Sequence, residues 1–276
     1  MKINYSFHSH TFRCGHAVGD ISDYVSFAIK NGYKMFGVSD HVFLPGVHQP
    51  SIRGDYSLLN EYINEFNRVK EEYKNEIEMF LGFECEYCSD FHNYYLSLLK
   101  DKDFDFLICG QHMRLDRNGF KSGYFGKDLP LDWSLSVYTH DIIDAMKSGL
   151  FLYIAHPDIF FVEATEVNDQ YKQATKDIIE AAIKYNSVLE INIHGFLRNH
   201  YHNGEYSIEY PCLYFWEEVA KTNIRVVCGG DFHNPNEIGD ENLIAQFDEL
   251  IKKTGIQLVD ISEIYKEYRD KLQDLL

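Results

Sequence analysis

Seven short apolar runs alternate with amphipathic stretches along the chain, and this alternation constrains the fold more than any other feature. The runs are rich in β-branched and aromatic residues and are flanked by Gly, Asp or Asn, which is typical of buried parallel strands. They are Ile3–Phe7, Lys34–Val38, Ile77–Gly82, Phe104–Cys109, Leu150–Ala155, Val188–Ile193 and Ile224–Cys228.

The stretches between the runs carry apolar residues at helical spacing. In the first, they recur at i, i+3, i+4, i+7 and i+8 from Ile21, and Gly32 offers a C-terminal stop. The same pattern predicts helices at Leu59–Val69, Asn93–Leu99, Leu135–Lys147, Gln170–Tyr185, Leu213–Lys221 and Glu241–Lys252. Strands that alternate with helices predict an α/β fold with a parallel sheet, in one domain over residues 1–276.

Every predicted strand carries or is followed by His, Asp or Glu at its carboxyl end. In a closed barrel these ends meet at one mouth, whereas in an open doubly wound sheet they would spread along a line. The distribution therefore favours a barrel. The side chains concerned are His8, His10, Asp40, His41, Glu84, His112, His156, Asp158, His194, Asp231 and His233, with His16 in the loop after the first strand.

Pairs of these residues have the spacing of metal ligands. His8 and His10 are two apart on an extended strand and point the same way, and Asp231 and His233 repeat the spacing on the last strand. A single histidine at a strand end is more often an ordinary hydrogen-bonded residue. Seven of them together with Glu84 and Asp231 predict a metal cluster, and imidazole with carboxylate suits zinc, manganese or iron.

Charge and composition exclude several classes of protein. The formal net charge is −17, which repels nucleic acid and anionic lipid. No apolar run is long enough to span a membrane, and the first residues do not read as a signal peptide. Six scattered cysteines predict reduced thiols in a cytoplasmic protein, and the one CxxC motif, Cys85–Cys88, is a weak metal signal.

The ordered motifs HxH, H, SDH, GxE, GxH, AHPD and GDxH resemble those of the PHP (polymerase and histidinol phosphatase) family. In length the chain is similar to the stand-alone histidinol-phosphate phosphatases of that family. The resemblance implies a distorted seven-stranded (β/α)7 barrel of the TIM type and three divalent metal ions (zinc, manganese or iron). By motif it implies a first ion on His8, His10, Glu84 and Asp231, a second on Glu84, His112 and His156, and a third on His16, His41 and His233.

The activity implied is hydrolysis of a small-molecule phosphomonoester, with L-histidinol phosphate, from histidine biosynthesis, as the leading substrate. Two neighbouring cations lower the pKa of a shared water towards ~7, and the resulting hydroxide attacks phosphorus. The bound cations also reverse the local field, which reconciles an acidic protein with an anionic substrate. We expect Glu84, Asp231 and His233 to form the catalytic centre.

Substrate contacts are expected from basic residues near the mouth. Arg198 is the leading phosphate ligand, with Arg114 and His194 as further contacts, and Arg13 and Arg53 rank lower. Histidinol-phosphate phosphatases often carry a basic residue shortly after the fifth-strand histidine, and this chain has none between Asp158 and Val162. The loop Arg114–Asp132 could supply other substrate-binding residues, which are Asp116, Arg117, Lys121, Tyr124 and Lys127.

Three residues are expected to orient the metal ligands, namely Asp40, Asp158 and Asn192, and the first two are also candidates to protonate the leaving group. The other histidines are predicted to be solvated or structural: His48, His92, His140, His200 and His202.

Other activities stay open. Within the same fold the substrate could be phosphotyrosine or a nucleotide, although a polynucleotide track needs a basic stripe that the chain lacks. An amidohydrolase-type C–N hydrolase is a further alternative, and a non-catalytic module is least favoured because all nine ligand positions are kept. The sequence leaves the oligomeric state open.

Overall fold

Four parallel strands form the larger sheet of the structure, which is a computed structural model. The structure describes residues 3–120, 122–125, 127, 129–198, 201–202, 205–206 and 208–276. The strands are β1 (Tyr5–Ser6), β2 (Met35–Val38), β3 (Glu78–Cys85) and β4 (Phe106–Cys109), in this spatial order. Their register places Phe36 beside Met79 and Glu84 beside Ile108. The first four predicted strands are therefore present and parallel.

A second parallel pair continues the curve of this sheet. β7 (Leu189–Asn192) pairs with β10 (Val226–Gly229), and Ile154 bridges in parallel to Cys109 on one side and Leu189 on the other. Ser9 bridges to Phe232, and Val226 to Leu258. The α/β class and a curled parallel sheet are confirmed, whereas a complete seven-stranded barrel is not: the predicted fifth strand, Leu150–Ala155, is reduced to the bridge at Ile154.

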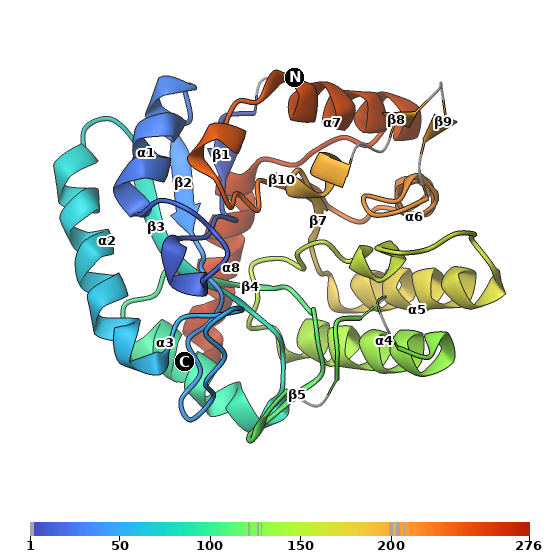
Figure 1. Cartoon of the computed structure of the whole chain (residues 1–276), viewed down its shortest axis with the longest axis horizontal. Coiled ribbons are helices and arrows are strands. Elements are labelled where there is room, and N and C mark those ends of the chain that lie inside the picture. Colours follow the sequence, from blue (N-terminus) through green and yellow to red (C-terminus); the bar gives the residue numbers. More distant parts are fainter. Residues whose placement is uncertain are drawn as a thin grey trace.

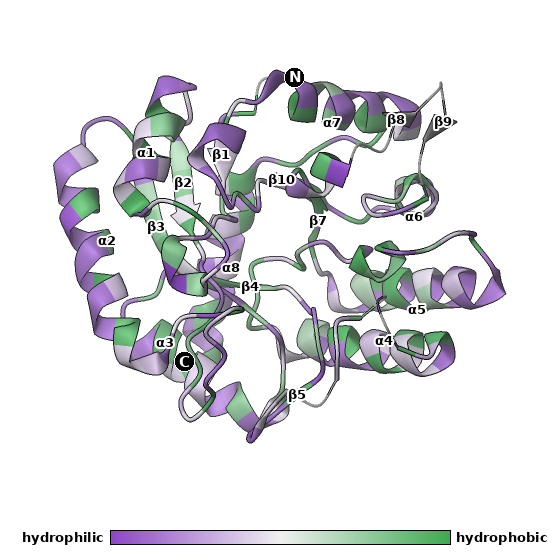
Figure 2. Ribbon diagram, viewed as in Figure 1, coloured by the Kyte–Doolittle hydropathy of each residue, from purple (hydrophilic) through white to green (hydrophobic). Residues whose placement is uncertain are grey.

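Helices surround the curled sheet, with α1 to α3 on one side and α4 to α7 on the other (Figure 1). Hydrophilic residues gather on their outward faces, as their amphipathic patterns predict (Figure 2). Their bounds are α1 (Ile21–Lys30), α2 (Leu59–Tyr73), α3 (His92–Asp101), α4 (Leu131–Ser148), α5 (Asp169–Tyr185), α6 (Leu213–Ala220) and α7 (Glu241–Thr254).

One further helix, α8 (Ile261–Leu275), was not predicted and crosses behind the strands in Figure 1. The ring of Tyr265 lies 5.9 Å from that of Phe7 and 4.7 Å from that of Phe80. The hydroxyl of Tyr268 accepts a hydrogen bond from the backbone N–H of Leu107 and donates one to the carbonyl of Leu150. Phe80 and Leu107 lie near the beginnings of β3 and β4, so α8 covers the amino-terminal end of these strands.

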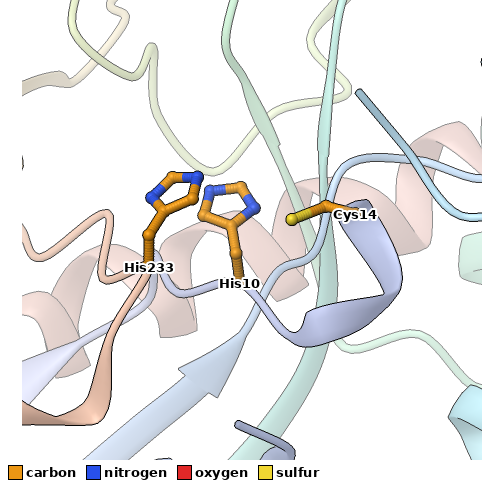
Figure 3. A group of neighbouring side chains, drawn as sticks. All are labelled: His10, Cys14 and His233. Atoms are coloured by element: carbon orange, nitrogen blue, oxygen red, sulfur yellow. The ribbon is translucent and has the colours of Figure 1, made fainter. Parts of the chain in front are cut away.

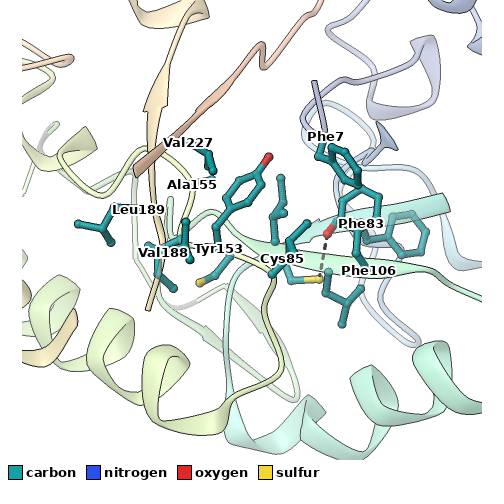
Figure 4. Packing of buried hydrophobic residues seen from close by; sticks show 14 of the residues in the cluster. Phe7, Phe83, Cys85, Phe106, Tyr153, Ala155, Val188, Leu189 and Val227 are labelled. Carbon is teal, nitrogen blue, oxygen red and sulfur yellow. Dashed lines mark hydrogen bonds between the residues drawn. The ribbon is translucent and has the colours of Figure 1, made fainter. Parts of the chain in front are cut away.

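The core between the strands is apolar and closely packed. Phe7, Phe83 and Phe106 from the larger sheet lie near Tyr153 and Val227 from the other side (Figure 4), and all five are almost completely buried. Removing such a side chain from water contributes on the order of 2 kcal/mol. This core fixes the strands beneath the mouth.

Short elements and loops complete the chain. The hairpins are β5 (Leu115–Asp116) with β6 (Gly119–Phe120), and β8 (Tyr201–His202) with β9 (Glu205–Tyr206). Of the residues singled out in the sequence, Lys121 and His200 lie outside the described residues. No described helix has the length and apolar character needed to cross a bilayer.

Candidate metal centre

The Glu84 carboxylate, near the end of β3, is the centre around which the predicted ligands gather. It is 1% exposed, and Gly110, directly after the neighbouring strand β4, leaves room for it, because a Cβ there would collide with the Glu84 side chain. Five imidazoles lie within 3.5 Å of it: His156 at 2.8 Å, His41 at 3.0 Å, His8 and His112 at 3.4 Å and His10 at 3.5 Å.

Asp231, after β10, closes one side of this cluster. Its Oδ1 lies 2.9 Å from Nε2 of His10 and 3.4 Å from Nε2 of His8. Asp231 and His156 both have positive backbone φ values, 51° and 30°, which cost energy for residues other than glycine. Such backbone strain is concentrated at functional sites, and here it turns two predicted ligands inwards.

The third predicted group also assembles. His16, His41 and His233 each offer a ring nitrogen within 4.8 Å of the other two. The ring of His10 lies between the ring of His233, 4.2 Å away, and the sulfur of Cys14 (Figure 3). The structure thus brings together all nine positions expected from the sequence motifs.

Several inward-facing atoms of the cluster have no hydrogen-bond partner. His41 Nδ1 lies 3.0 Å from Glu84 Oε2, yet neither atom makes a hydrogen bond. The same holds for Nε2 of His8. Buried polar atoms normally have partners, so close but misaligned nitrogen and oxygen donors fit divalent cations better than they fit one another.

Neighbouring imidazoles keep both central carboxylates ionised. Burial alone would raise the pKa of Glu84, but the charges of His112, His8 and His41 lower it well below the usual range. Burial acts in the same direction on Asp231, and His8 and His10 outweigh it, so that its pKa is also well below normal. Two permanent negative charges therefore face the centre.

The imidazoles fall into two electrostatic classes. Burial lowers the pKa of His41 to about 4 and that of His233 well below normal, with repulsion from His10 adding to both. Burial has the same effect on His10, but its hydrogen bond to Asp231 and the nearby carboxylate of Asp40 raise its pKa to about 9. Glu190, Asp231 and Glu84 likewise raise the pKa of His8 above normal.

Two of the three predicted orienting residues contact the cluster. Asn192 donates from Nδ2 to Asp231 Oδ2 at 3.0 Å. Asp40 accepts from Thr11 and from the backbone of His41, and its Oδ1 lies 3.6 Å from Nδ1 of His10. Asp40 therefore holds the backbone of His41 and faces the ring of His10.

The hydrogen bonds that Asp158 makes within the described part of the chain are not to the metal ligands that it was expected to orient. Its Oδ2 accepts hydrogen bonds from the backbone N–H of Cys212 and from Nε1 of Trp216. Burial raises the pKa of Asp158 to about 7. Its side chain belongs to the packing beneath α6.

Three glutamates missed in the sequence hold the imidazoles instead. Glu190 lies 2.8 Å from Nδ1 of His8 and accepts from the backbone N–H of His156. Glu86 and Glu237 lie 3.1 Å from Nδ1 of His112 and of His194, respectively. Glu190 could have been recognised from the sequence, because it is an acidic residue inside the apolar run Val188–Ile193. A carboxylate is buried only where it has partners.

Of the four arginines expected near the mouth, one lies close to the centre and three lie elsewhere. Arg198, in η5 (His194–Arg198), lines the cavity above the cluster, as His194 does. Arg114 lies 3.9 Å from Asp141 on α4 and is not among the described lining residues. Arg13 pairs with the partly exposed Asp20 and Glu61, and Arg53 forms a buried ion pair with Glu86, so both serve ion pairs instead of a substrate.

The remaining sequence signals have structural roles. Cys85 lies in the core, with its thiol directed at the carbonyl of Phe83, and all six cysteines are free. His48 is exposed beside Asp55, His92 lies beside the hydroxyl of Tyr87, and His140 lies beside Asp141. The side chain of His202 is outside the described part of the chain.

A cavity of about 670 Å³ opens above the cluster. Its floor includes His41, His112, Asp231 and His233. Its described walls are Ser51, Ile52, Met113, Tyr124, Lys127, Ile159, Leu197, Arg198 and Tyr210, together with His16 and His194. The size and the mixture of cationic, phenolic and apolar walls suit a small anionic molecule.

Comparisons with known proteins agree with this geometry. The model of the family described as "PHP domain" matches residues 6–194. A "Probable histidinol-phosphatase" of Deinococcus radiodurans is 25% identical, covering 84% of this chain and 87% of the relative. A "Probable phosphatase" of Acetivibrio thermocellus is 24% identical and covers 99% of both chains.

The fold also resembles a solved structure of histidinol phosphate phosphatase from Lactococcus lactis, in complex with zinc, L-histidinol and phosphate. The TM-score is 0.69 at 19% identity, covering 93% of this chain and 95% of the other. At this identity the likeness concerns the fold alone.

Proposed function

Because the chain belongs to the PHP family, we propose that it is a metal-dependent phosphomonoesterase with L-histidinol phosphate as its first candidate substrate. The observation that carries the proposal is the buried Glu84 carboxylate within 3.5 Å of five imidazoles. The relatives named as histidinol-phosphatases support the substrate. We also propose that the isolated bridges complete a closed seven-stranded barrel, and that the free thiols reflect a cytoplasmic protein.

The donor atoms suit three divalent cations of the zinc, manganese or iron type. The grouping of His8, His10 and Glu84 supports a first ion completed by Asp231, and that of His16, His41 and His233 supports a third. Glu84 with His112 and His156 would hold the second. When bound, such ions activate a water for attack and neutralise the charge that develops on phosphate.

The chain's own residues then position the substrate. Arg198 lies over the ring of Tyr210, with its Cζ 5.7 Å from the ring centroid, and presents its guanidinium to the cavity as a phosphate ligand. Asn192 holds Asp231 in place, and Glu190 holds His8. These bonds keep His8 and Asp231 aligned before substrate arrives, and Asp231 forms the proposed catalytic centre with Glu84 and His233.

His194 is the residue that we assign to protonation of the leaving group. Glu237 lies 3.1 Å from Nδ1 of His194, which leaves Nε2 to donate a proton. Burial lowers the pKa of His194, but the carboxylate of Glu237 outweighs this effect, so that the pKa is raised. H194N should lower kcat for an alkyl phosphate by roughly 10²-fold or more. It should affect p-nitrophenyl phosphate far less, because that leaving group needs no proton; an equal loss on both substrates would contradict the assignment.

The activity test is phosphate release from L-histidinol phosphate by protein loaded with zinc, manganese or iron. Phosphotyrosine, a nucleoside monophosphate and an amide substrate run alongside, each with a chelator control. We expect chelator-sensitive turnover, highest on histidinol phosphate. E84Q should lose at least ~10³-fold of it, while H48A, which alters an exposed histidine beside Asp55, should keep it.

Other outcomes redirect the proposal. Chelator-sensitive hydrolysis of another phosphomonoester would keep the phosphatase and replace the substrate. Phosphate release that survives chelation, or hydrolysis of C–N bonds alone, would overturn the metal-dependent phosphomonoesterase.

A further inference from the structure

The loop between His112 and α4 folds back over the metal centre. The backbone N–H of Phe125 donates to the carbonyl of His112 at 2.8 Å, and that of Arg114 donates to Oγ of Ser122. Phe125 is fully buried, and its ring lies 5.5 Å from that of Tyr138 on α4. These anchors lie beside Tyr124 and Lys127, both of which line the cavity.

Two columns of side chains, called stacks below, rise from the centre into this cavity, with a tilted ring pair in one and a T-shaped ring pair in the other. On one side, the ring of Tyr124 lies 5.6 Å from that of His112, and Nζ of Lys127 lies 4.9 Å from the centroid of Tyr124. On the other, Tyr210 lies 6.3 Å from His156 and carries Arg198. The rings of His112 and His156 are only 4.8 Å apart, so the two stacks start side by side.

Each stack therefore ends in a cation that is supported by an aromatic ring. An aromatic face steadies an ammonium or guanidinium while its N–H groups stay available to a ligand. Lys127 and Arg198 line the same cavity, and both belong to stacks that begin at imidazoles bordering Glu84. In a chain of net charge −17, two such cations at one opening favour an anion there.

We propose that Lys127 is a second phosphoryl-binding residue, which together with Arg198 clamps the substrate phosphate between the two stacks. This rests on the proposed phosphatase function and adds a specificity residue to it. The phosphoryl oxygens directed away from the metal ligands would accept from the Lys127 ammonium on one side and the Arg198 guanidinium on the other. Ile52, Met113 and Ile159 line the same cavity and present apolar surface beside the two cations.

Inorganic phosphate is the probe that tests this assignment, because it contains the phosphoryl group without any leaving group. Its affinity for the zinc-loaded protein is measured by calorimetry for the wild type, K127M, K127R and R117A. K127M keeps a chain of similar length without the charge. R117A is the matched control, since Arg117 is exposed on the same loop and its backbone is held by Asp90.

We expect K127M to bind phosphate roughly tenfold to a hundredfold more weakly, as for a lost charge-assisted hydrogen bond. Its kcat/KM should fall by a similar factor, mainly through KM. K127R should stay within a few-fold of the wild type, R117A should be unchanged, and the zinc content should be the same in all four proteins.

Three results would overturn the proposal. Unchanged phosphate affinity in K127M, with or without a higher KM, would place Lys127 on the leaving group or outside the site. Equal losses in K127M and K127R, or loss of zinc, would assign the effect to packing on Tyr124. Absence of phosphate binding by the wild type would remove the clamp altogether.

The binding arm is independent of catalysis. A wild type that hydrolyses no phosphomonoester would refute the proposed function, whereas the comparison of phosphate affinities would still decide whether Lys127 holds a phosphoryl group.

Discussion

The two ends of the sheet are built on opposite principles. At the amino-terminal end, α8 packs aromatic rings onto the strands, and the hydroxyl of Tyr268 both accepts and donates a hydrogen bond. At the carboxyl-terminal end, Glu84 and Asp231 face buried imidazoles, and Oε2 of Glu84 has no hydrogen-bond partner.

The difference shows where stability and function are placed. Apolar contacts and satisfied polar groups at the α8 end favour the folded chain. Strained backbone and unsatisfied buried groups at the mouth cost stability and create a binding site. Changes at the mouth should therefore alter metal binding and catalysis, whereas changes at the α8 end should alter the free energy of unfolding.

Removal of the metal ions should give the largest difference between the two ends of the sheet, with loss of activity at the mouth and an unchanged fold at the α8 end. Chelation should abolish phosphate release, a loss of ~10³-fold or more, because the developing charge on phosphate is no longer neutralised. Saturating metal at about 100 times its Kd stabilises by only ~2.7 kcal/mol, so the helices should persist in far-UV circular dichroism. Hydrogen exchange should accelerate at the mouth and not in α8; loss of α8 protection on chelation would break the distinction.

Tyr268→Ala tests the opposite end. The change removes a buried ring and two hydrogen bonds, and we expect the free energy of unfolding to fall by ~3–5 kcal/mol. Y268F, which loses only the hydroxyl, should cost about 1–3 kcal/mol. Urea denaturation measures both, and kcat/KM of the folded protein should be unchanged; a selective loss of activity without loss of stability would contradict the division.

Glu190→Gln tests whether the contact of Glu190 with His8 contributes to metal binding at the mouth. Without its charge, Nδ1 of His8 loses its carboxylate partner, and zinc affinity should fall by ~10–100-fold. Unfolding of the metal-free protein should change little. Competition with a chromophoric chelator gives the affinity, with E263Q in the exposed first turn of α8 as the control; equal effects of the two substitutions would remove the assigned role of Glu190.

Competition between protons and metal should give the smallest effect when it is counted for one unit of pH. In the metal-free protein the pKa of His10 is about 9, so this imidazole is protonated at pH 7 and must release its proton to bind a cation. Zinc affinity should therefore rise by about tenfold per pH unit for each proton released, until pH approaches 9. Calorimetry in buffers of different ionisation enthalpy counts these protons, and a pH-independent affinity between pH 6 and 8 would refute the competition.

Much of the fold and most of the candidate site could be predicted because their signals are local. The strand periodicity around Val188–Ile193 and the His8–His10 spacing each depend on a few adjacent residues, and strand direction alone brings distant histidines to one mouth. The predicted cluster accordingly assembles around Glu84, with the expected ligands from every part of the sheet.

The failures concern contacts between residues far apart in the chain. Asp158 follows His156 by two residues, yet it bonds to Trp216 on α6, while Glu190, 34 residues beyond His156, holds that histidine's backbone. Helix α8 was not predicted, and its place across the beginnings of β3 and β4 depends on contacts with Phe80 and Leu107.

The sequence by itself therefore determined which side chains stand at the strand ends, since local periodicity sets the direction of each strand and helix. Only the tertiary structure decided which carboxylate supports each imidazole and which basic loop residue, Lys127 or Arg117, faces the cavity. Those choices depend on packing between segments distant in sequence, because burial allows a charge only where another part of the chain supplies its partner.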